Sequence, residues 1–240
     1  MQKTLFISDL HLHSNRPDIN QLFLQFLEQE ASTADALYIL GDLFEFWIGD
    51  DDIDGEYHEV IQALRQLTNT GVPVYFMRGN RDFLIGECFA EQTGCTLLDD
   101  PTVIELYGER VLLMHGDTLC TDDVEYQAFR DEVRTAAWQE RVLAIGLEER
   151  VNYFQTLREA SQKSIQEKPQ AIMDVNQGAV EAAMSDAQVT TLIHGHTHRP
   201  DTHHFSLDGQ PAKRIVLGDW YEHGSVLVAT EDNLRLEQRK

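Results

Sequence analysis

The first 80 residues alternate between short apolar runs and apolar stripes at helical spacing. The run at residues 5–7 stops at Asp9, which predicts a buried strand with a carboxylate at its end. After Pro17 the apolar positions follow a helical period, at Ile19, Leu22, Phe23, Phe26 and Leu27. Because proline suits the first turn of a helix, we predict that an amphipathic helix begins at this point.

The same alternation continues as far as Asn80. Residues 36–40 and 74–77 predict two more strands, each followed closely by a polar block. A second amphipathic helix is predicted between them, from Val60, Ile61, Leu64 and Leu67. Strands that alternate with helices at this spacing form parallel βαβ units, so we predict an α/β fold. Ligands of such folds gather at the carboxyl ends of the strands, where Asp9, Asp42 and Asn80 would meet.

The second half of the chain combines strands with one long helical region. Strands are predicted at residues 103–106, 110–114 and 190–193, and a closing antiparallel group at residues 215–217, 225–229 and 234–236. The pattern between these groups, from about residue 122 to 184, is almost purely helical. A helical excursion between two polar blocks is typical of a cap inserted over an active site. We therefore expect a single domain over residues 1–240, with a helical cap insertion at about 122–184.

The composition is that of an ordinary globular protein, with 42% hydrophobic and 25% charged residues. No stretch approaches the roughly 18 uninterrupted apolar residues of a membrane-spanning helix. The early Asp9 indicates a first strand rather than an export signal. The three cysteines, Cys88, Cys95 and Cys120, lack CxxC spacing, so we expect free thiols in a reducing cytoplasm.

The formal net charge of −22 restricts the expected partners. Proteins that bind nucleic acids usually present a basic face, so we expect no nucleic acid partner. Two bound dications would offset part of this charge, and a solvated acidic surface accounts for most of the remainder. Nothing in the sequence indicates an obligate protein partner.

Five short polar blocks carry the chemistry, and most of them follow a predicted strand. They are Asp9-Leu10-His11, Gly41-Asp42, Gly79-Asn80-Arg81-Asp82, Met114-His115-Gly116-Asp117 and His194-Gly195-His196-Thr197-His198. Together they supply carboxylate oxygens, an amide oxygen and imidazole nitrogens, which is the ligand mixture of a pair of divalent transition metals. A metal pair of this kind is suited to the hydrolysis of phosphate esters.

Each block alone is weak evidence, because short Asp-, Asn- and Gly-containing turns are common. The last block differs, since three imidazoles within five residues are hard to explain by packing and would repel one another when protonated. We expect Asp9 and His11 to share one face of an extended segment, where side chains repeat every two residues. We also expect Gly195 to allow the bend that turns His196 and His198 inward.

In this order, the five blocks resemble the signature of the calcineurin-like metallophosphoesterases. The resemblance implies an α/β fold with a β-sandwich core flanked by helices (αββα). It also implies that one metal is held by Asp9, His11, Asp42 and His198, and the other by Asp42, Asn80, His115 and His196. Asp42 would bridge the two ions, because a carboxylate has two oxygens and relieves the repulsion between cations about 3.5–4 Å apart.

One position departs from the pattern of the wider family. Most members have a histidine after the motif asparagine, where this chain has Arg81. Arginine is not a proton donor at ordinary pH, but its fork suits two phosphate oxygens. We therefore expect Asn80, Arg81 and His196 to be the catalytic residues, and to face the charge that develops in the transition state.

Longer matches indicate a narrower group. The stretches at residues 40–45, 115–123, 171–176 and 194–200 are very similar to the UDP-2,3-diacylglucosamine diphosphatases of lipid A biosynthesis. This resemblance implies a hydrolase with two Mn²⁺ ions, bound peripherally at the cytoplasmic face of the inner membrane. It implies that the substrate UDP-2,3-diacylglucosamine is split at its pyrophosphate into UMP and 2,3-diacylglucosamine 1-phosphate (lipid X). Nitrogen and oxygen donors without a thiolate also leave Fe²⁺ or Zn²⁺ open.

The narrower resemblance further implies substrate contacts, some of them from the cap. They fall on Asn80, Arg81, Asp123, Ser161, Lys168 and His196. A further contact, usually small and polar, falls on Ile165, which offers no comparable hydrogen bond, although Ser164 lies beside it. Glutamates are interspersed with the basic residues of the cap, so we expect weaker attachment to anionic lipid through charge.

Other interpretations of the sequence stay open. A phosphodiesterase or nucleotide pyrophosphatase acting on soluble dinucleotides would have the same metal ligands, and a non-catalytic interaction protein can have the same fold. The acidic run at residues 50–55 matches half of a calcium loop, but Ile61 stands where the bidentate glutamate belongs, so we predict a solvated turn. We place His13, His194, Asp82 and Asp117 outside the metal ligands, in supporting, turn or surface positions.

Overall fold

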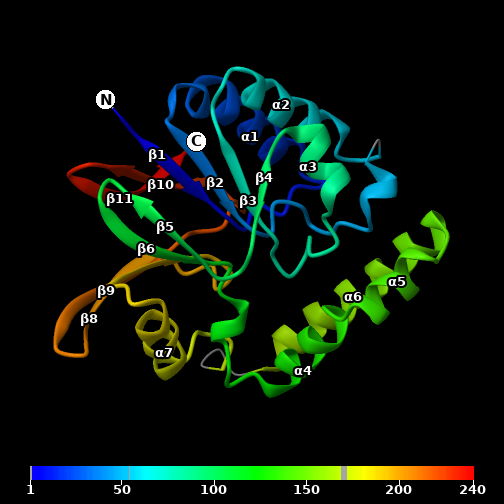
Figure 1. The fold of residues 1–240 in the computed structure, drawn as a ribbon. Coiled ribbons are helices and arrows are strands. Elements are labelled where there is room, and N and C mark those ends of the chain that lie inside the picture. The colour runs from blue at the N-terminus through cyan, green and yellow to red at the C-terminus, as the bar shows by residue number, and fades with distance from the viewer. Residues whose placement is uncertain (1, 54, 169–171) are drawn as a thin grey trace.

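Two β-sheets pack face to face, with helices on both outer sides of the pair (Figure 1). The computed structural model describes residues 2–53, 55–168 and 172–240, apart from the side chains of residues 162, 165 and 167. The order of layers is helices, sheet, sheet, helix. This arrangement confirms the α/β sandwich predicted from the sequence.

The first sheet has six strands in the order β11-β10-β1-β2-β3-β4. Its parallel strands are β1 (Thr4–Ile7), β2 (Ala36–Leu40), β3 (Val74–Met77) and β4 (Thr96–Leu98). The hairpin of β10 (Gly224–Thr230) and β11 (Asn233–Arg239) completes the sheet, and β10 pairs antiparallel with β1. The first strand of the chain therefore lies between β2 and one of the last two strands.

Three helices cover the outer face of this sheet (Figure 1). They are α1 (Pro17–Gln29), α2 (His58–Asn69) and α3 (Glu87–Thr93). The first begins at Pro17 and buries Ile19 and Phe23, and the second buries the predicted stripe that includes Ile61 and Leu64, so both predictions are confirmed. The sequence did not predict α3 and β4, because elements of seven and three residues are too short to show a period.

The second sheet has five strands in the order β5-β6-β7-β9-β8. They are β5 (Thr102–Leu106), β6 (Glu109–Met114), β7 (Thr191–His194), β9 (Gln210–Val216) and β8 (Asp201–Leu207). The helix α7 (Gln177–Ala187) covers its outer face through Val180 and Met184. The predicted closing antiparallel group is wrong in one respect, because β9 belongs to this sheet whereas β10 and β11 belong to the first. An apolar run in the sequence predicts a strand but does not identify the strand with which it pairs.

Alternation of side chains along the strands builds the core. In β1, Phe6 faces the second sheet, while Leu5 and Ile7 face the helices. In β6, Leu113 faces the interior between the sheets, while Leu112 packs with α7. Because both faces of these strands are covered, they are continuous apolar runs in the sequence. Each such side chain contributes about 1.5–3 kcal/mol on burial, so the strand ends are firmly held.

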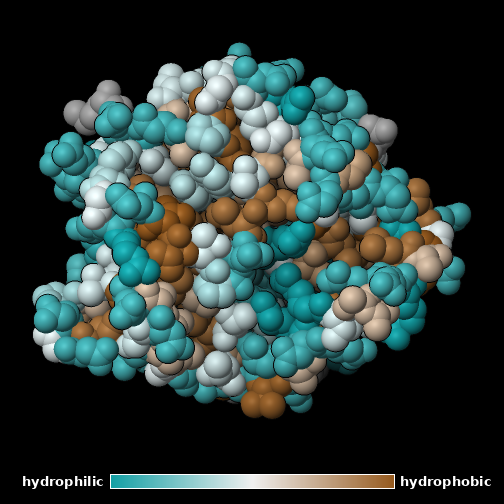
Figure 2. Space-filling view, in the orientation of Figure 1, coloured by the Kyte–Doolittle hydropathy of each residue, from teal (hydrophilic) through white to brown (hydrophobic). Residues whose placement is uncertain are grey.

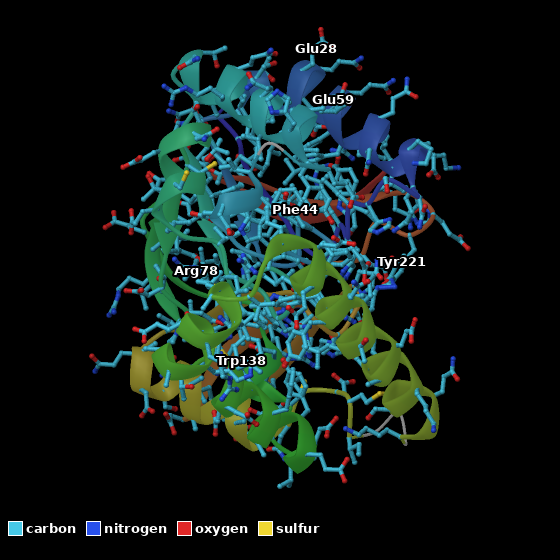
Figure 3. The ribbon with its side chains drawn as sticks, turned by 90° about the vertical axis from the view of Figure 1, so that its right-hand side faces the viewer. Glu28, Phe44, Glu59, Arg78, Trp138 and Tyr221 are labelled. Carbon is cyan, nitrogen blue, oxygen red and sulfur yellow. The ribbon has the colours of Figure 1, made fainter. Side chains whose placement is uncertain are left out.

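Three helices of the predicted helical region extend away from the sandwich (Figure 1). They are α4 (Val124–Val133), α5 (Ala136–Leu143) and α6 (Leu147–Glu167), here called the helical projection. Trp138, which lies within these helices in Figure 3, and Phe154 both pack against Phe83 of the sandwich. Within the part of the chain that the structure describes, no helix has the length and apolar character needed to cross a membrane.

Arg150 connects the projection to the sandwich. Its side chain is buried, and its guanidinium donates to the carbonyl of Ile48 and to both carboxylate oxygens of Asp51, at 2.6 and 2.9 Å. It also donates to the carbonyl of Leu143, the last residue of α5, and to that of Ile145, between α5 and α6. One side chain therefore joins the turn of the projection to the loop after β2.

The acidic run at residues 50–55 is part of this connection. Asp50 accepts hydrogen bonds from the backbone N–H groups of Gly86 and Phe89, at the start of α3, and from the indole of Trp47. Asp51 binds Arg150 as described. The prediction of a merely solvated turn is therefore wrong for these two carboxylates, which have partners far away in the sequence. Asp54 lies outside the described residues.

We expect the Arg150→Met variant to lower the free energy of unfolding by about 2–3 kcal/mol, because it leaves Asp51 and three carbonyl groups without their donor. Urea denaturation followed by circular dichroism measures this change. The exposed Arg141 on α5 provides the matched control, and Arg141→Met should unfold at the wild-type midpoint. Equal midpoints for the two variants would show that Arg150 does not hold the projection in place.

Candidate metal centre

The loops after β1 and β2 run side by side beyond the first sheet. The backbone N–H of Asp9 donates to the carbonyl of Gly41 at 3.1 Å, and that of His11 donates to the carbonyl of Asp42 at 3.0 Å. These bonds continue the pairing of the two strands. They place the first two expected metal ligands beside the third.

Five of the seven expected ligands have a left-handed backbone. They are Asp9 (φ 57°), His11 (φ 50°), Asp42 (φ 54°), His196 (φ 68°) and His198 (φ 55°). The expectation of an extended segment at residues 9–11 is therefore wrong, because a bend at each ligand turns its side chain inward. Such conformations cost on the order of 1 kcal/mol or more each for residues other than glycine, and they cluster at functional sites. Their coincidence with the expected ligands is strong evidence for a site.

Gly195 has a different role from the expected one. A Cβ atom at this position would lie 2.3 Å from the hydroxyl oxygen of Ser8 and 2.4 Å from Oδ2 of Asp9. The backbone bends occur at His196 and His198, whereas Gly195 does not have a positive φ. The position therefore needs glycine for close packing against the loop after β1, and the expected role in the bend is wrong.

Six expected ligands form two groups of donor atoms, each group within 4.8 Å. One consists of Asp9, His11 and His198, and the other of Asp42, His115 and His196. Asp42 of the second group also borders the first, since its Oδ1 is 3.8 Å from Nε2 of His115 and its Oδ2 is 3.9 Å from Nε2 of His11. The structure thus contains two adjacent candidate metal sites, and the two oxygens of one carboxylate face one site each.

Asn80 belongs to the second group by its contacts. Its side-chain oxygen is 3.0 Å from Nε2 of His115 and 2.8 Å from Nδ1 of His196. His115 donates from Nδ1 to the carbonyl of Leu40 at 2.8 Å. This bond fixes the tautomer and leaves the lone pair of Nε2 directed at the site, which is how metal-binding histidines are usually oriented.

Buried donor atoms in the first group lack hydrogen-bond partners among the described residues. Oδ2 of Asp9 accepts from the hydroxyl of Ser8 and the backbone N–H of His196, whereas its buried Oδ1 has only Nε2 of His198, a second expected ligand, 3.4 Å away. The Nδ1 atom of His11 is also buried without a hydrogen bond, although Oε2 of Glu45 lies 3.8 Å away. Unpaired buried atoms of this kind are costly, so the donor set fits a bound cation.

The pKa shifts of the second group also indicate a site for a bound cation. Burial raises the pKa of Asp42 to about 7. Burial alone would lower the pKa of His115, but the nearby carboxylates, Asp42 foremost, raise it to about 9. Burial, followed by the charge of His115, lowers the pKa of His196 to about 4. These ligands compete for protons, and a divalent cation would stabilise all of them in the deprotonated form.

Two carboxylates near the ligands hold the surrounding backbone. Asp82 is fully buried and accepts hydrogen bonds from the backbone N–H groups of Gly79, Leu43 and Asp42, at 2.7, 2.8 and 3.3 Å. Oδ2 of Asp117 accepts from Arg130 at 2.7 Å and from Tyr126 at 2.9 Å. The first fixes the loops after β2 and β3, and the second fixes the start of the projection.

Neither of the two remaining histidines of the motif regions lies in a ligand group. His194 is buried, with Nε2 3.1 Å from the guanidinium of Arg214 and Nδ1 2.8 Å from the carbonyl of Gly195. His13 lies at the surface, 3.7 Å from a carboxylate oxygen of Glu56. Both positions agree with their exclusion from the ligand set.

Some residues that lie beside the site were not predicted from the sequence. Oδ2 of Asp219 lies 3.4 Å from Nδ1 of His198, and the ring of Tyr221 stacks on that of His11 with centroids 5.7 Å apart. Figure 3 shows Tyr221 at the edge of the molecule, where it is half exposed. These residues come singly from the loop after β9, so no motif could have identified them. Glu45, in contrast, lies three residues after Asp42 and offered such a signal.

The structure shows a direct contact between two of the residues expected to bind substrate, Lys168 and Asp123. The Nε atom of Arg81 is buried without a partner among the described residues. Nζ of Lys168 lies 2.7 and 2.9 Å from the two oxygens of Asp123, whose Oδ1 also caps α4. Ser161 lies on α6, together with Ser164. Ile165 is on the same helix, but its side chain lies outside the described residues.

The comparisons with known proteins agree with this geometry. A model of the calcineurin-like phosphoesterases matches residues 2–200. The chain is 54% identical to a UDP-2,3-diacylglucosamine hydrolase of Chromohalobacter salexigens, over 96% of this chain and 94% of that protein. It is 52% identical to one of Escherichia coli, over 97% of each. An archaeal phosphodiesterase structure is similar in fold, with a TM-score of 0.50 and 13% identity over 99% of both chains.

Proposed function

Because this chain belongs to the calcineurin-like phosphoesterase family, we propose that it hydrolyses the pyrophosphate bond of UDP-2,3-diacylglucosamine, giving 2,3-diacylglucosamine 1-phosphate and UMP. The observation that carries the proposal is the position of Asp42 between two groups of buried donor atoms. The relatives at 54% and 52% identity supply the identity of the substrate through their names.

We assign the cations to the ligands expected from the family pattern. One would be held by Asp9, His11, Asp42 and His198, and the other by Asp42, Asn80, His115 and His196. We propose Mn²⁺ at both, with Fe²⁺ or Zn²⁺ as alternatives for this donor set. When bound, such a pair supplies positive charge that favours ionisation of water near neutral pH and offsets the charge of the phosphate.

Arg81 would stabilise the charge that grows on the non-bridging oxygens of the attacked phosphate. Its guanidinium is always protonated and its fork matches two phosphate oxygens. Its unpartnered Nε is available without the loss of an existing hydrogen bond. We assign Asn80 and His196, whose side chains lie 2.8 Å apart, to the same role beside the non-bridging oxygens of the phosphate. Since the nucleophile is water, no phosphoryl group is transferred to the protein.

We propose that the helical projection is the cap over the substrate, within a single domain of residues 1–240. The cap would then consist of α4, α5 and α6, because α7 packs on the second sheet. Asp123, Ser161 and Lys168 would hold the glucosamine phosphate. The contact between Lys168 and Asp123 supports this assignment, and Nε of Arg158, on the same helix as Ser161, donates to Glu45 beside His11.

We further propose that the protein attaches peripherally to the cytoplasmic face of the inner membrane through apolar side chains of the projection. Val124, Phe129, Leu143 and Leu147 are 72%, 42%, 40% and 40% exposed. Figure 2 shows apolar surface at the end of the molecule where α5 and α6 lie. Arg150, Arg158 and Lys168 are paired with carboxylates, so attachment would depend on apolar burial more than on anionic lipid.

Turnover of authentic UDP-2,3-diacylglucosamine, with and without added Mn²⁺, tests the proposed function. We expect UMP release that requires the metal and is much faster than hydrolysis of a dinucleoside polyphosphate. The opposite preference would identify a hydrolase of soluble dinucleotides. A metal-loaded protein that hydrolyses neither these compounds nor bis(p-nitrophenyl) phosphate would be a non-catalytic member of the family.

A further inference from the structure

A pocket of about 240 Å³ lies beside the loop that carries His196 and His198. Thr197, between these two histidines, lines the pocket, whereas the histidines themselves do not. Arg214 lines it from the outer face of β9. Pockets that enclose a whole small ligand usually measure about 300–1,000 Å³. This pocket is therefore sized for one part of a larger ligand.

Two polar atoms of residues that line this pocket are buried without partners. They are the hydroxyl oxygen of Thr197 and the Nε atom of Arg214, neither of which has a hydrogen bond within the described residues. Arg214 is only 6% exposed, and its Nη1 is held 3.1 Å from Nε2 of His194. Because unpaired buried donors are costly, these two fixed groups indicate that a polar ligand occupies the pocket during function.

The charges around the pocket exclude an anion as its main ligand. The carboxylates of Asp174 and Asp201 balance the guanidinium groups of Arg199 and Arg214. One of these pairs is in direct contact, with NH1 of Arg199 2.5 Å from Oδ2 of Asp174. A balanced set of donors and acceptors suits a neutral polar molecule, and polar walls do not suit an acyl chain.

We infer that this pocket binds the nucleoside half of the substrate, an inference that rests on the function proposed above. The substrate has three parts, namely apolar acyl chains, an anionic pyrophosphate and a neutral polar nucleoside, and only the last matches these walls. The hydroxyl of Thr197 and Nε–H of Arg214 would donate to carbonyl oxygens of the pyrimidine ring. The carboxylate of Asp201, which is exposed at the rim, would accept from the ribose hydroxyls.

The place of Thr197 in the chain supports the same assignment. Its two neighbours, His196 and His198, belong to different ligand groups. Because Thr197 is joined to one ligand of each group, a nucleoside bound beside it would lie close to the chain segment that contributes to both candidate cation sites. The sugar contacts proposed for Asp123, Ser161 and Lys168 come from the projection instead.

Inhibition of bis(p-nitrophenyl) phosphate hydrolysis in Mn²⁺ tests the inference. The inhibitors are UMP and methyl phosphate, which share the phosphate monoester but not the nucleoside. For the wild type we expect UMP to inhibit at least tenfold more tightly than methyl phosphate. The inhibition ratio is the inhibition constant of methyl phosphate divided by that of UMP. In Thr197→Val and in Asp201→Asn this ratio should fall by about three- to tenfold, the effect of one lost hydrogen bond.

Thr118→Val is the matched control, because Thr118 lies three residues after the expected ligand His115 and has a buried, unpartnered hydroxyl, but does not line the pocket. Its inhibition ratio should equal that of the wild type. A wild-type ratio near one, or ratios in Thr197→Val and Asp201→Asn that match the control, would overturn the inference while leaving the proposed hydrolysis intact. Failure of the wild type to release UMP from UDP-2,3-diacylglucosamine in Mn²⁺, measured on the same preparation, would instead overturn the proposed function.

Discussion

The Asp42→Ala variant loses hydrolysis by a factor on the order of 10³ or more, measured as UMP release in Mn²⁺. The carboxylate of Asp42 faces both ligand groups, so its removal weakens both cation sites at once. The fold should persist. Burial raises the pKa of this carboxyl to about 7, because burial disfavours its charged form.

Thermal unfolding separates a loss of metal from a loss of structure. Saturating Mn²⁺ should stabilise the wild type by about 3 kcal/mol at a hundredfold excess over the dissociation constant, and should stabilise Asp42→Ala far less. Asp186 on α7 is exposed, so Asp186→Ala is the matched control and should keep both activity and stabilisation. Near-normal hydrolysis in Asp42→Ala would refute a dinuclear centre.

The Asp82→Ala variant should lose about 3 kcal/mol of unfolding free energy and about 10- to 100-fold in turnover. Three backbone N–H groups, from Gly79, Asp42 and Leu43, point at this buried carboxylate and would lose their acceptor. The same bonds hold the loops that carry Asp42 and Asn80. A supporting carboxylate is therefore expected to affect both stability and catalysis.

Urea denaturation and turnover of the proposed substrate measure the two effects of the Asp82 substitution. Asp82→Asn keeps one acceptor oxygen and nearly the same volume, so it should lie between the wild type and Asp82→Ala in both measurements. An alanine variant with wild-type stability would show that water replaces the carboxylate without cost. A stable variant with reduced turnover would assign Asp82 a role in catalysis alone.

The first half of the fold could be predicted because its elements are long enough to show a period. The helix that starts at Pro17 has 13 residues with four buried apolar positions, and its pattern is unambiguous. The pairing of the last strands could not be predicted in the same way. Residues 215 and 227 are both apolar and both face the interior between the sheets, yet they come from different sheets. Strand pairing depends on the whole topology rather than on local sequence.

The candidate site could be predicted in composition but not in geometry. The five blocks predicted seven ligands, and the structure brings these side chains together. The backbone conformation was predicted wrongly, because a left-handed residue such as His11 or His198 is disfavoured locally and is held by contacts with distant loops. Tyr221 and Asp219 were not predicted, since a single residue in a loop has no pattern that identifies its neighbours.

The pairing of β10 with β1 has a consequence for synthesis of the chain on the ribosome. Strand β1 emerges early, but one of its edges stays open until residues 224–230 have left the exit tunnel. The ligand group that contains Asp9 and His11 is likewise incomplete until His198 has been synthesised. Complete metal loading is therefore an event after translation of nearly the whole chain. A nascent chain that stalls before this point exposes an apolar strand edge, which is the kind of surface that chaperones bind.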